Sequence, residues 1–379
     1  MSDPALFEPP DGPPGGWPAD APMERAYLEA FAREGAPTLI SNLRTRVLGL
    51  HSGGRVFPVT VNDGEYGDSY VCLPHTAYAL YAKAELGMVD VGPFAPALRL
   101  LAGGAGGVMR AAAMNRIVHV GNWMLSTNLH GGWKGEDVGA IRGLVAKAYP
   151  DHLICVRSVN GWSDPALLAA LRCDGWELLP SRQIWVVDDL VRDWRPRRDT
   201  RRDIALARCT RFLRDDLATL RPGDADRIAE LYAMLYLDRY SALNPAFTSA
   251  YIAMTHEQKV FRYAGFRDPD GRLAAVAGCF VRDGVLTTPI LGYDTAQPAE
   301  EGLYRLASLA FAEIAEALGA RLNGSAGAAS FKRNRGARAQ TEYMAIYAAH
   351  LSPPRRAVVA AMRALLQRVA LPIMQKRGL

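Results

Sequence analysis

Predicted secondary-structure elements occur in nearly the same order twice along the 379 residues, and this repetition constrains the fold most. Residues 23–190 read as helix, hairpin, strand, glycine loop, helix, strand, short helix and a pair of strands. Residues 223–350 read as a helix, three strands joined by PDG and DG turns, a helix, a strand, a small-residue loop, a short helix and a last strand. The pattern predicts an α+β fold of two tandem units, each a mixed, mainly antiparallel sheet flanked by helices.

Three further segments complete the predicted division of the chain. Residues 1–22 are rich in proline, glycine and acid, so we expect a flexible leader. Residues 191–222 form an arginine-rich connection between the two units, and residues 351–379 form a basic amphipathic tail.

Charge is distributed unevenly behind a net value of +5. Residues 192–214 hold nine arginines against three aspartates, a local +6. Residues 355–377 carry another +6 with no acidic residue, which leaves −7 for the rest of the chain. The pattern predicts anionic partners at two defined places rather than a general nucleic-acid binder.

The tail alternates apolar pairs with arginines, which is typical of an amphipathic helix lying on anionic lipid. The alternative is a helix docked on the body with its arginines in solvent. The arginine-rich connection could bind nucleic acid, but only Trp194 and Phe212 interleave with its arginines, so nucleic acid is the less favoured partner.

Cysteine usage and the absence of a secretory pattern favour a cytoplasmic protein. The basic tail adds the prediction that this protein is peripheral on the inner membrane. The five cysteines are scattered and form no CxxC pair. Residues 86–115 are the most apolar stretch, but Asp90, Pro93 and Arg99 interrupt them, so no spanning helix is predicted there. This stretch is either buried core or a surface that touches lipid or an acyl chain.

The familiar local signatures of metal, nucleotide and serine-hydrolase chemistry are missing from the sequence. It contains no HExxH, no GxxxxGK[ST], no GxSxG, and no GxGxxG after a predicted strand. The seven histidines are scattered. We therefore predict no metal site and no bound cofactor.

A small-residue turn between a strand and a short helix is the strongest candidate site. It runs from Asn323 through Ser325 to Lys332, Arg333 and Gly336. Small residues let a ligand approach the backbone, and free N–H groups at a helix start favour an anion or oxyanion. The alternative is a tight structural turn with a solvated basic end.

The segment FKRNRG at residues 331–336, followed by a strand carrying Glu342 and Tyr343, resembles the FK-x-x-x-G signature of FemABX-like N-acyltransferases. These are double-domain members of the GNAT superfamily. The resemblance covers roughly residues 37–350, mostly through element order. It implies two tandem GNAT-like domains and places Lys332 at the reaction centre, where the residue would steady an oxyanion.

More narrowly, VTVNDGEYGDSYVC (59–72) and LNGSAGAASFKRNRGA (322–337) resemble segments of bacterial ceramide synthases. Those enzymes acylate the amine of a sphingoid base. The resemblance implies a sphingoid base and a long-chain acyl-CoA or acyl carrier protein thioester as co-substrates.

One departure from the GNAT pattern concerns the pyrophosphate loop. The corresponding segment, residues 297–304, has one glycine, Gly302, beside Glu300 and Glu301. Acids at a helix start compete with an anion for the same dipole. The first half offers a glycine-richer loop, so the thioester carrier either binds there or is held mainly by a strand edge and the basic patches, and the second alternative is favoured. The residues predicted for this role are Gly131, Gly132, Lys134, Gly302 and Arg333.

The predicted catalytic residues are Lys332, with Asp63 to take a proton and Tyr293 as an acid. The predicted substrate-binding residues lie in three polar segments: Tyr66, Asp68, Tyr70, Arg239, Tyr240, Asn244, Asn323 and Ser325.

The sequence thus predicts an enzyme that forms an amide between a fatty acyl thioester and a sphingoid base. The closest alternative is a tRNA-dependent aminoacyltransferase of the FemABX type, using the arginine-rich connection. The other is a non-catalytic GNAT-like protein that binds lipid or a partner.

Overall fold

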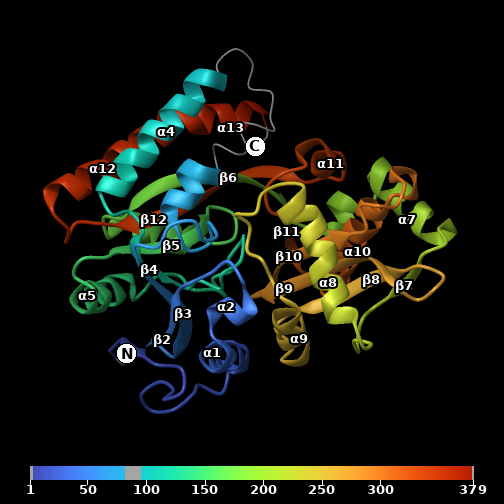
Figure 1. Ribbon diagram of the computed structural model, residues 1–379, viewed down its shortest axis with the longest axis horizontal. Helices are drawn as coiled ribbons and strands as arrows, with labels where there is room; N and C mark the ends of the chain where they lie inside the picture. Colours follow the sequence, from blue (N-terminus) through green and yellow to red (C-terminus); the bar gives the residue numbers. More distant parts are fainter. Residues whose placement is uncertain (1–2, 82–94, 378–379) are drawn as a thin grey trace.

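A single twelve-stranded sheet runs through the whole protein (Figure 1). The computed structural model describes residues 3–81 and 95–377. The strand order in the sheet is β1-β2-β3-β4-β5-β12-β6-β11-β10-β9-β8-β7. Among its pairs, β4–β5 and β10–β11 are parallel and the others are antiparallel. The strands are β1 (Ala5–Phe7), β2 (Arg46–Ser52), β3 (Arg55–Asp63), β4 (Arg116–Val120), β5 (Leu153–Asn160), β6 (Glu177–Val187), β7 (Leu213–Asp215), β8 (Arg262–Arg267), β9 (Leu273–Arg282), β10 (Val285–Tyr293), β11 (Arg321–Asn323) and β12 (Arg338–Tyr347).

Helices cover both faces of the sheet, which confirms the predicted α+β class. Their bounds are α1 (Pro22–Glu34), α2 (Ala36–Leu39), α4 (Ala95–Ala111), α5 (Val138–Ala148), α6 (Pro165–Cys173), α7 (Arg198–Cys209), α8 (Asp224–Ala233), α9 (Ser249–Glu257), α10 (Leu303–Ala317), α11 (Ala329–Asn334), α12 (Pro353–Leu365) and α13 (Leu371–Arg377). Short π-type and 3₁₀ turns are η1 (Thr76–Tyr81), η3 (Leu190–Trp194), η4 (Met234–Asp238), η5 (Ala299–Glu301) and η6 (Leu366–Ala370).

The two halves exchange a strand. β12, the last strand, lies between β5 and β6 of the first half, with Glu342 opposite Asn160 on one side and Arg182 on the other. β6 in turn pairs with β11 of the second half. The halves therefore share one sheet and meet along β6, β11 and β12.

The predicted flexible leader is wrong for the part of it that forms β1. Ala5, Leu6 and Phe7 pair with β2, and Phe7 is buried against Gly49 and the ring of Trp17. A Cβ at Gly49 would lie 2.1 Å from the Phe7 ring, so the glycine makes room for the leader.

The arginine-rich connection folds into η3 and α7, and three of its nine arginines pair with distant acids. Two of its arginines bond neighbouring aspartates and three reach the second half. The pairs are Arg192–Asp193, Arg202–Asp199, Arg195–Glu316, Arg211–Glu301 and Arg214–Glu313. On α7, Arg201 and Arg208 are exposed and have no acidic partner among the described residues.

Helices α4, α12 and α13 lie together over one end of the sheet (Figure 1). Cluster residues from α4, β6, β12 and α12 pack beneath them: Met109, Leu179, Met344, Ile346, Val359 and Met362. Within the described residues, the helix Pro353–Lys376 is long and apolar enough to cross a membrane by length and composition. Its most apolar window has a mean hydropathy of 1.5 and is only 11% buried.

Candidate functional site

A fork between two parallel strands creates the opening of the site. β10 pairs with β11 only over Val285–Thr287, after which β10 has an irregularity at Pro289 and continues to Tyr293. β11 instead bends towards β6, where Gly324 N–H donates to Trp185 O and Trp185 N–H donates to Ser325 O. Among the described strands, none pairs with residues 288–293 on the side facing β11. Residues 288–293 therefore form an unpaired strand edge on this side, and an extended ligand can add to an edge of this kind.

The predicted turn after β11 has the expected small-residue geometry. Ser325 and Ala328 have left-handed backbone torsions, and Asn323 Oδ1 accepts a hydrogen bond from Ser325 N–H at 2.9 Å. Gly336 ends the motif at φ +87°, where a Cβ would lie 2.0 Å from Asp193 O. The glycine of the FK-x-x-x-G pattern is therefore required by the close approach of η3.

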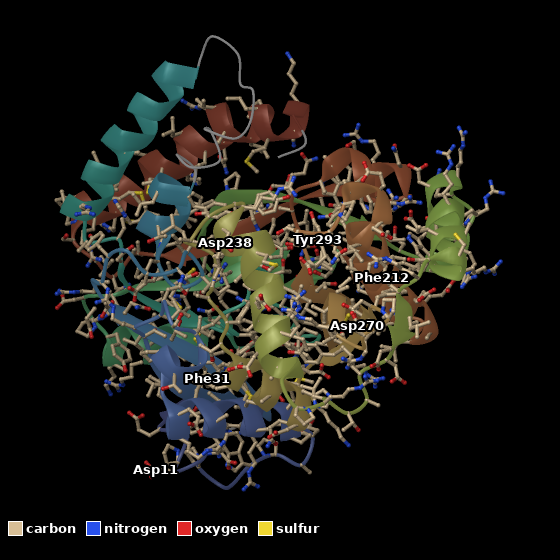
Figure 2. The ribbon with its side chains drawn as sticks, turned by 45° about the vertical axis from the view of Figure 1, so that its right-hand side comes forward. Asp11, Phe31, Phe212, Asp238, Asp270 and Tyr293 are labelled. Atoms are coloured by element: carbon tan, nitrogen blue, oxygen red, sulfur yellow. The ribbon has the colours of Figure 1, made fainter. Side chains whose placement is uncertain are left out.

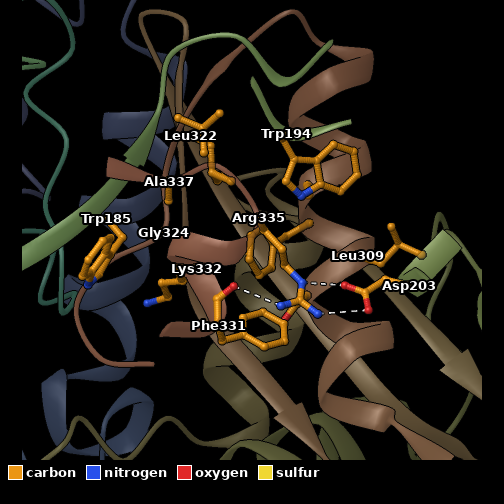
Figure 3. Close-up of a pocket in the computed structure, with 14 residues that line it drawn as sticks. Trp185, Trp194, Asp203, Leu309, Leu322, Gly324, Phe331, Lys332, Arg335 and Ala337 are labelled. Carbon is orange, nitrogen blue, oxygen red and sulfur yellow. Dashed lines mark hydrogen bonds and ion pairs between the residues drawn. The ribbon is translucent and has the colours of Figure 1, made fainter. Parts of the chain in front are cut away.

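Lys332 projects from α11 into the gap beneath Trp185 and Gly324 (Figure 3). Its Nζ donates to Ala326 O at 2.7 Å and to Ser325 O at 3.3 Å. Burial of the amine, and secondly the nearby Arg182 guanidinium, lower the pKa of Lys332 to about 7. No carboxylate pairs with Lys332 among the described residues, so a large fraction of its amine is neutral near pH 7.

A buried ion pair lies next to this lysine. Arg182 Nη2 is 2.7 Å from Glu342 Oε1, and the same guanidinium bonds Thr127 Oγ1 at 2.9 Å and Ser325 Oγ at 3.4 Å. Glu342 is 1% exposed, and its Oε2 is buried without a hydrogen-bond partner in the described structure. A buried carboxylate oxygen without a partner is costly and suggests that a ligand donates to it.

A narrow cavity of about 40 Å³ lies between α11, β11 and α10, and Lys332 and Gly324 form part of its wall. Its wall includes the rings of Trp185, Trp194 and Phe331, with Asp203 and Arg335 at one end (Figure 3). Arg335 forms two hydrogen bonds to Asp203 and one to Phe331 O, which fixes α11 on α7. A cavity of this volume holds water rather than a substrate.

An aromatic row connects α11 to the end of β10. Phe331 contacts Tyr304 with ring centroids 4.8 Å apart, and Tyr304 contacts Tyr293 at 6.0 Å. Arg239 donates to Tyr293 Oη at 3.0 Å, and Figure 2 labels Tyr293 close to the end of η4. Burial raises the pKa of Tyr304 to about 12, so its hydroxyl stays protonated.

Several predicted residues therefore gather at this site. Lys332, Arg333, Asn323 and Ser325 form the turn itself, and Arg333 stacks on Trp185. Tyr293, Arg239 and Tyr240 border its aromatic side. The loop that carries Tyr70 also contacts the second half, because Tyr70 N–H donates to Leu243 O.

Asp63 is not brought to Lys332. Asp63 is the last residue of β3 and pairs with Arg116, the first residue of β4. Thr127, which bonds Ser325 of the Lys332 turn, follows the other end of β4. Asp63 Oδ1 contacts His152 Nε2 at 2.7 Å and its side chain is 77% exposed. Its prediction relied on a loop that the sheet directs away from the site.

Three other predicted substrate-binding residues have structural partners. Asp68 binds Arg44 through both oxygens and is buried. Tyr66 stacks under Arg110. Asn244 donates to Tyr236 O and Ser241 O and closes the turn after η4.

The predicted thioester loops are both occupied by the protein itself. At Gly302, which precedes α10, a Cβ would lie 2.6 Å from the Leu206 side chain, and Glu301 is bound by Arg211. In the first half, a Cβ at Gly131 or Gly132 would meet the side chains of the β9–β10 turn at 2.7 Å. Lys134 lies beside them, exposed. Neither loop forms an open pyrophosphate cradle.

Sequence reasoning missed Arg182, Thr127 and Tyr304, and it used Glu342 only as part of the resemblance. Their sequence signal is weak, because each becomes significant only through a pairing with a residue more than 20 positions away. No group of three or more potential metal ligands occurs within the described residues.

Comparisons with known proteins agree with this architecture. No protein-family model matches the chain, and no curated protein matches it. Among solved structures, FemX has a TM-score of 0.51 at 10% identity, covering 86% of this chain and 91% of FemX. A tandem GNAT protein from the clavulanic acid biosynthesis pathway gives 0.41 at 13% identity (85% and 87%). L-PGS from Bacillus licheniformis gives 0.44 at 14% identity (66% and 83%).

The FemX likeness is one of fold. Together with the strand order, it shows that the chain has a FemX-like fold of two tandem α+β units sharing one mixed sheet.

Proposed function

We propose that the protein is an N-acyltransferase that forms an amide between a fatty acyl thioester and the amine of a sphingoid base. The observation that carries this proposal is Lys332, whose Nζ bonds two backbone carbonyls near the Arg182–Glu342 pair and whose pKa is lowered to about 7. A base with a pKa near the working pH is the group that acyl transfer to an amine requires.

The strand fork is the place for the thioester in this proposal. The pantetheine arm of acyl-CoA or of acyl carrier protein is an extended chain with two amides, and it matches an unpaired strand edge. The covered start of α10 disfavours a pyrophosphate, so acyl carrier protein, which lacks one, is the better fitting donor. The acyl carbonyl would then lie near Lys332.

The amine of the second substrate has a matching acceptor. A sphingoid base arrives as an ammonium, and the unpartnered Oε2 of Glu342 can hold it by a charge-assisted hydrogen bond. Beyond Glu342 on β12 and Arg182 on β6, Met344 and Leu179 are buried in the apolar cluster beneath α4 and α12. The acceptor oxygen of Glu342 is what supports an amine as the second substrate.

Lys332 can move the proton in this reaction. The ammonium held by Glu342 loses one proton to solvent before the attack. As the new C–N bond forms, neutral Lys332 accepts the second proton, and the resulting ammonium steadies the oxyanion. The C–S bond then breaks, and Lys332 returns the proton to the thiolate, which leaves amide, free thiol and one proton in solution.

Aminoacyl transfer from tRNA is the second candidate, supported by the FemX-like fold and by the absence of an open pyrophosphate loop among the described residues. The ion pairs of Arg195, Arg211 and Arg214 weigh against it, because they neutralise the connection that would bind tRNA. A non-catalytic scaffold would have no use for the amine of Lys332 or for the unpartnered carboxylate oxygen of Glu342.

We propose that the enzyme works at the cytoplasmic side of the membrane.

The test is incubation of purified protein with palmitoyl thioesters of CoA and of acyl carrier protein, each with sphinganine or 3-ketosphinganine. Mass spectrometry should detect the amide, with the carrier-protein donor preferred. No amide with any pair, while a charged tRNA loses its amino acid to an acceptor amine, would overturn the proposal. No turnover in either assay would favour the scaffold.

A further inference from the structure

Two helices at one end of the molecule share features that the proposed reaction does not use. α4 and the continuous helix α12–η6–α13 contain no acidic residue, and both lie over the sheet end that holds Leu179 and Met344 (Figure 1). Val108 on α4 is 53% exposed. Along α13, Leu371, Ile373 and Met374 are only partly covered.

Strong anchors hold the C-terminal helix against the body. Arg355 donates to Ala112 O, Ala113 O and Asp151 O at 2.6–3.0 Å, and Arg363 pairs with Glu177 at 2.7 Å. Val359 and Met362 are buried in the cluster beneath. Crossing a bilayer would break all of these contacts, so the apolar helix lies along the protein surface despite its length.

The exposed side of this helix combines small apolar residues with cations. Ala357 and Ala361 are exposed, as are Arg356, Arg368 and Lys376. Of these cations, none has an acidic partner among the described residues. Cations beside a partly covered apolar face complement a surface that is negative outside and apolar inside.

The composition of α4 points the same way. Gly103, Gly104 and Gly107 have no atom within 4 Å of an added Cβ, so packing does not explain them. Each such glycine weakens a helix in water by roughly 1 kcal/mol. A low-dielectric surface favours internal backbone hydrogen bonds and thus stabilises such a helix.

We infer that α4 and α12–α13 together form a docking surface for an anionic lipid bilayer. The surface lies over β6 and β12, the strands that carry Arg182 and Glu342, so docking would bring the proposed site close to a membrane that holds the long-chain amine. The choice of substrate rests on the proposed function, whereas the docking itself does not.

The experiment is flotation of the full-length protein with vesicles of phosphatidylcholine alone and with phosphatidylglycerol added. We expect binding to the anionic vesicles only, weakened by salt. Because each cation at a lipid surface contributes about fivefold in partitioning, Arg356→Gln with Arg368→Gln should weaken binding about 25-fold. The matched control, Arg201→Gln with Arg208→Gln on α7, should leave binding unchanged.

A second pair of variants tests the apolar part. Val108→Asp should weaken binding, whereas Leu318→Asp, at a residue 40% exposed after α10, should not. The inference would be overturned if each control variant lost as much vesicle binding as its partner, or if the protein did not bind anionic vesicles. It would also be overturned if the bound protein resisted extraction at alkaline pH, as a membrane-spanning protein does. If Arg356→Gln with Arg368→Gln weakened binding of acyl carrier protein and left vesicle binding unchanged, the inference would also be overturned.

An amide assay with detergent-dispersed substrates separates the two proposals. Amide formation without vesicle binding would refute docking and leave the reaction intact. Vesicle binding without amide formation would refute the reaction and support docking.

Discussion

Arg182 Nη2 lies 2.7 Å from Glu342 Oε1, and this ion pair joins a strand of the first half to the last strand of the second. The two residues are direct cross-strand neighbours, with side chains 19% and 2% exposed. The pair therefore exists only when β12 is inserted between β5 and β6. The carboxylate proposed to hold the substrate amine thus takes its place only through the strand exchange.

Arg182→Met should destabilise the protein by about 3–5 kcal/mol, because it leaves a buried carboxylate without its partner. Arg338→Met is the control, since Arg338 pairs with Asp188 across the same two strands but at the surface, with 49% and 37% exposure. It should cost at most about 1 kcal/mol. Urea unfolding measures both values, and equal losses would show that the buried pair carries no special weight.

Gly336→Ala should destabilise the protein by more than about 2 kcal/mol and reduce activity, because both a left-handed torsion and a 2.0 Å approach to Asp193 O oppose a Cβ. Gly319→Ala has a similar torsion, φ +59°, with open space around it. It should cost about 1 kcal/mol from the torsion alone. Thermal unfolding of both variants separates the two causes, and a Gly336→Ala variant as stable as Gly319→Ala would contradict the close approach.

The turn at Lys332 was predictable because its information is local. Small residues, a short helix and a closing glycine lie within 14 consecutive positions. The role of Gly336, in contrast, depends on η3, and Glu342 gains its meaning from Arg182, 160 residues earlier. Local patterns do not contain strand order, and the exchange of β12 was therefore not predicted.

Asp63 and the basic connection show the same limit. Asp63 ends β3 beside the start of β4, at the end of these strands away from the Lys332 turn. Only its pairing with Arg116 reveals this position. The arginines at 195, 211 and 214 are a charge excess in the sequence, yet acids of the second half neutralise them in the fold. Net charge within a sequence window does not report such long-range pairs.

Lys332→Ala should lower kcat/KM by about 10²–10⁴-fold, the usual contribution of a positioned acid–base group. Lys332→Arg is the informative variant. A guanidinium stays protonated and cannot accept the proton, so it should be as inactive as the alanine variant. Recovery of activity in Lys332→Arg would show that a fixed positive charge, acting on the oxyanion alone, is sufficient.

Lys332→Met should stabilise the protein at pH 7 by roughly 3 kcal/mol. The pKa of Lys332 falls to about 7 on folding because the amine is buried. Between pH 7 and about pH 10 the unfolded chain therefore binds a proton that the folded protein does not, and the stability of the native protein rises with pH. The methionine variant should lack this slope in urea unfolding, and an identical slope would contradict the buried neutral amine.

The pH dependence of kcat/KM shows whether the neutral amine or the ammonium form of Lys332 is the active one. If its neutral form is the base, activity rises about tenfold per unit below the pKa and becomes level above about pH 7. An O-alkyl hydroxylamine acceptor, which stays neutral over this range, removes the titration of the substrate from the profile. Lys332→Arg should lack the limb near pH 7. A profile that instead falls through pH 7 would assign the activity to the ammonium form, and Lys332 would then steady the oxyanion without taking the proton.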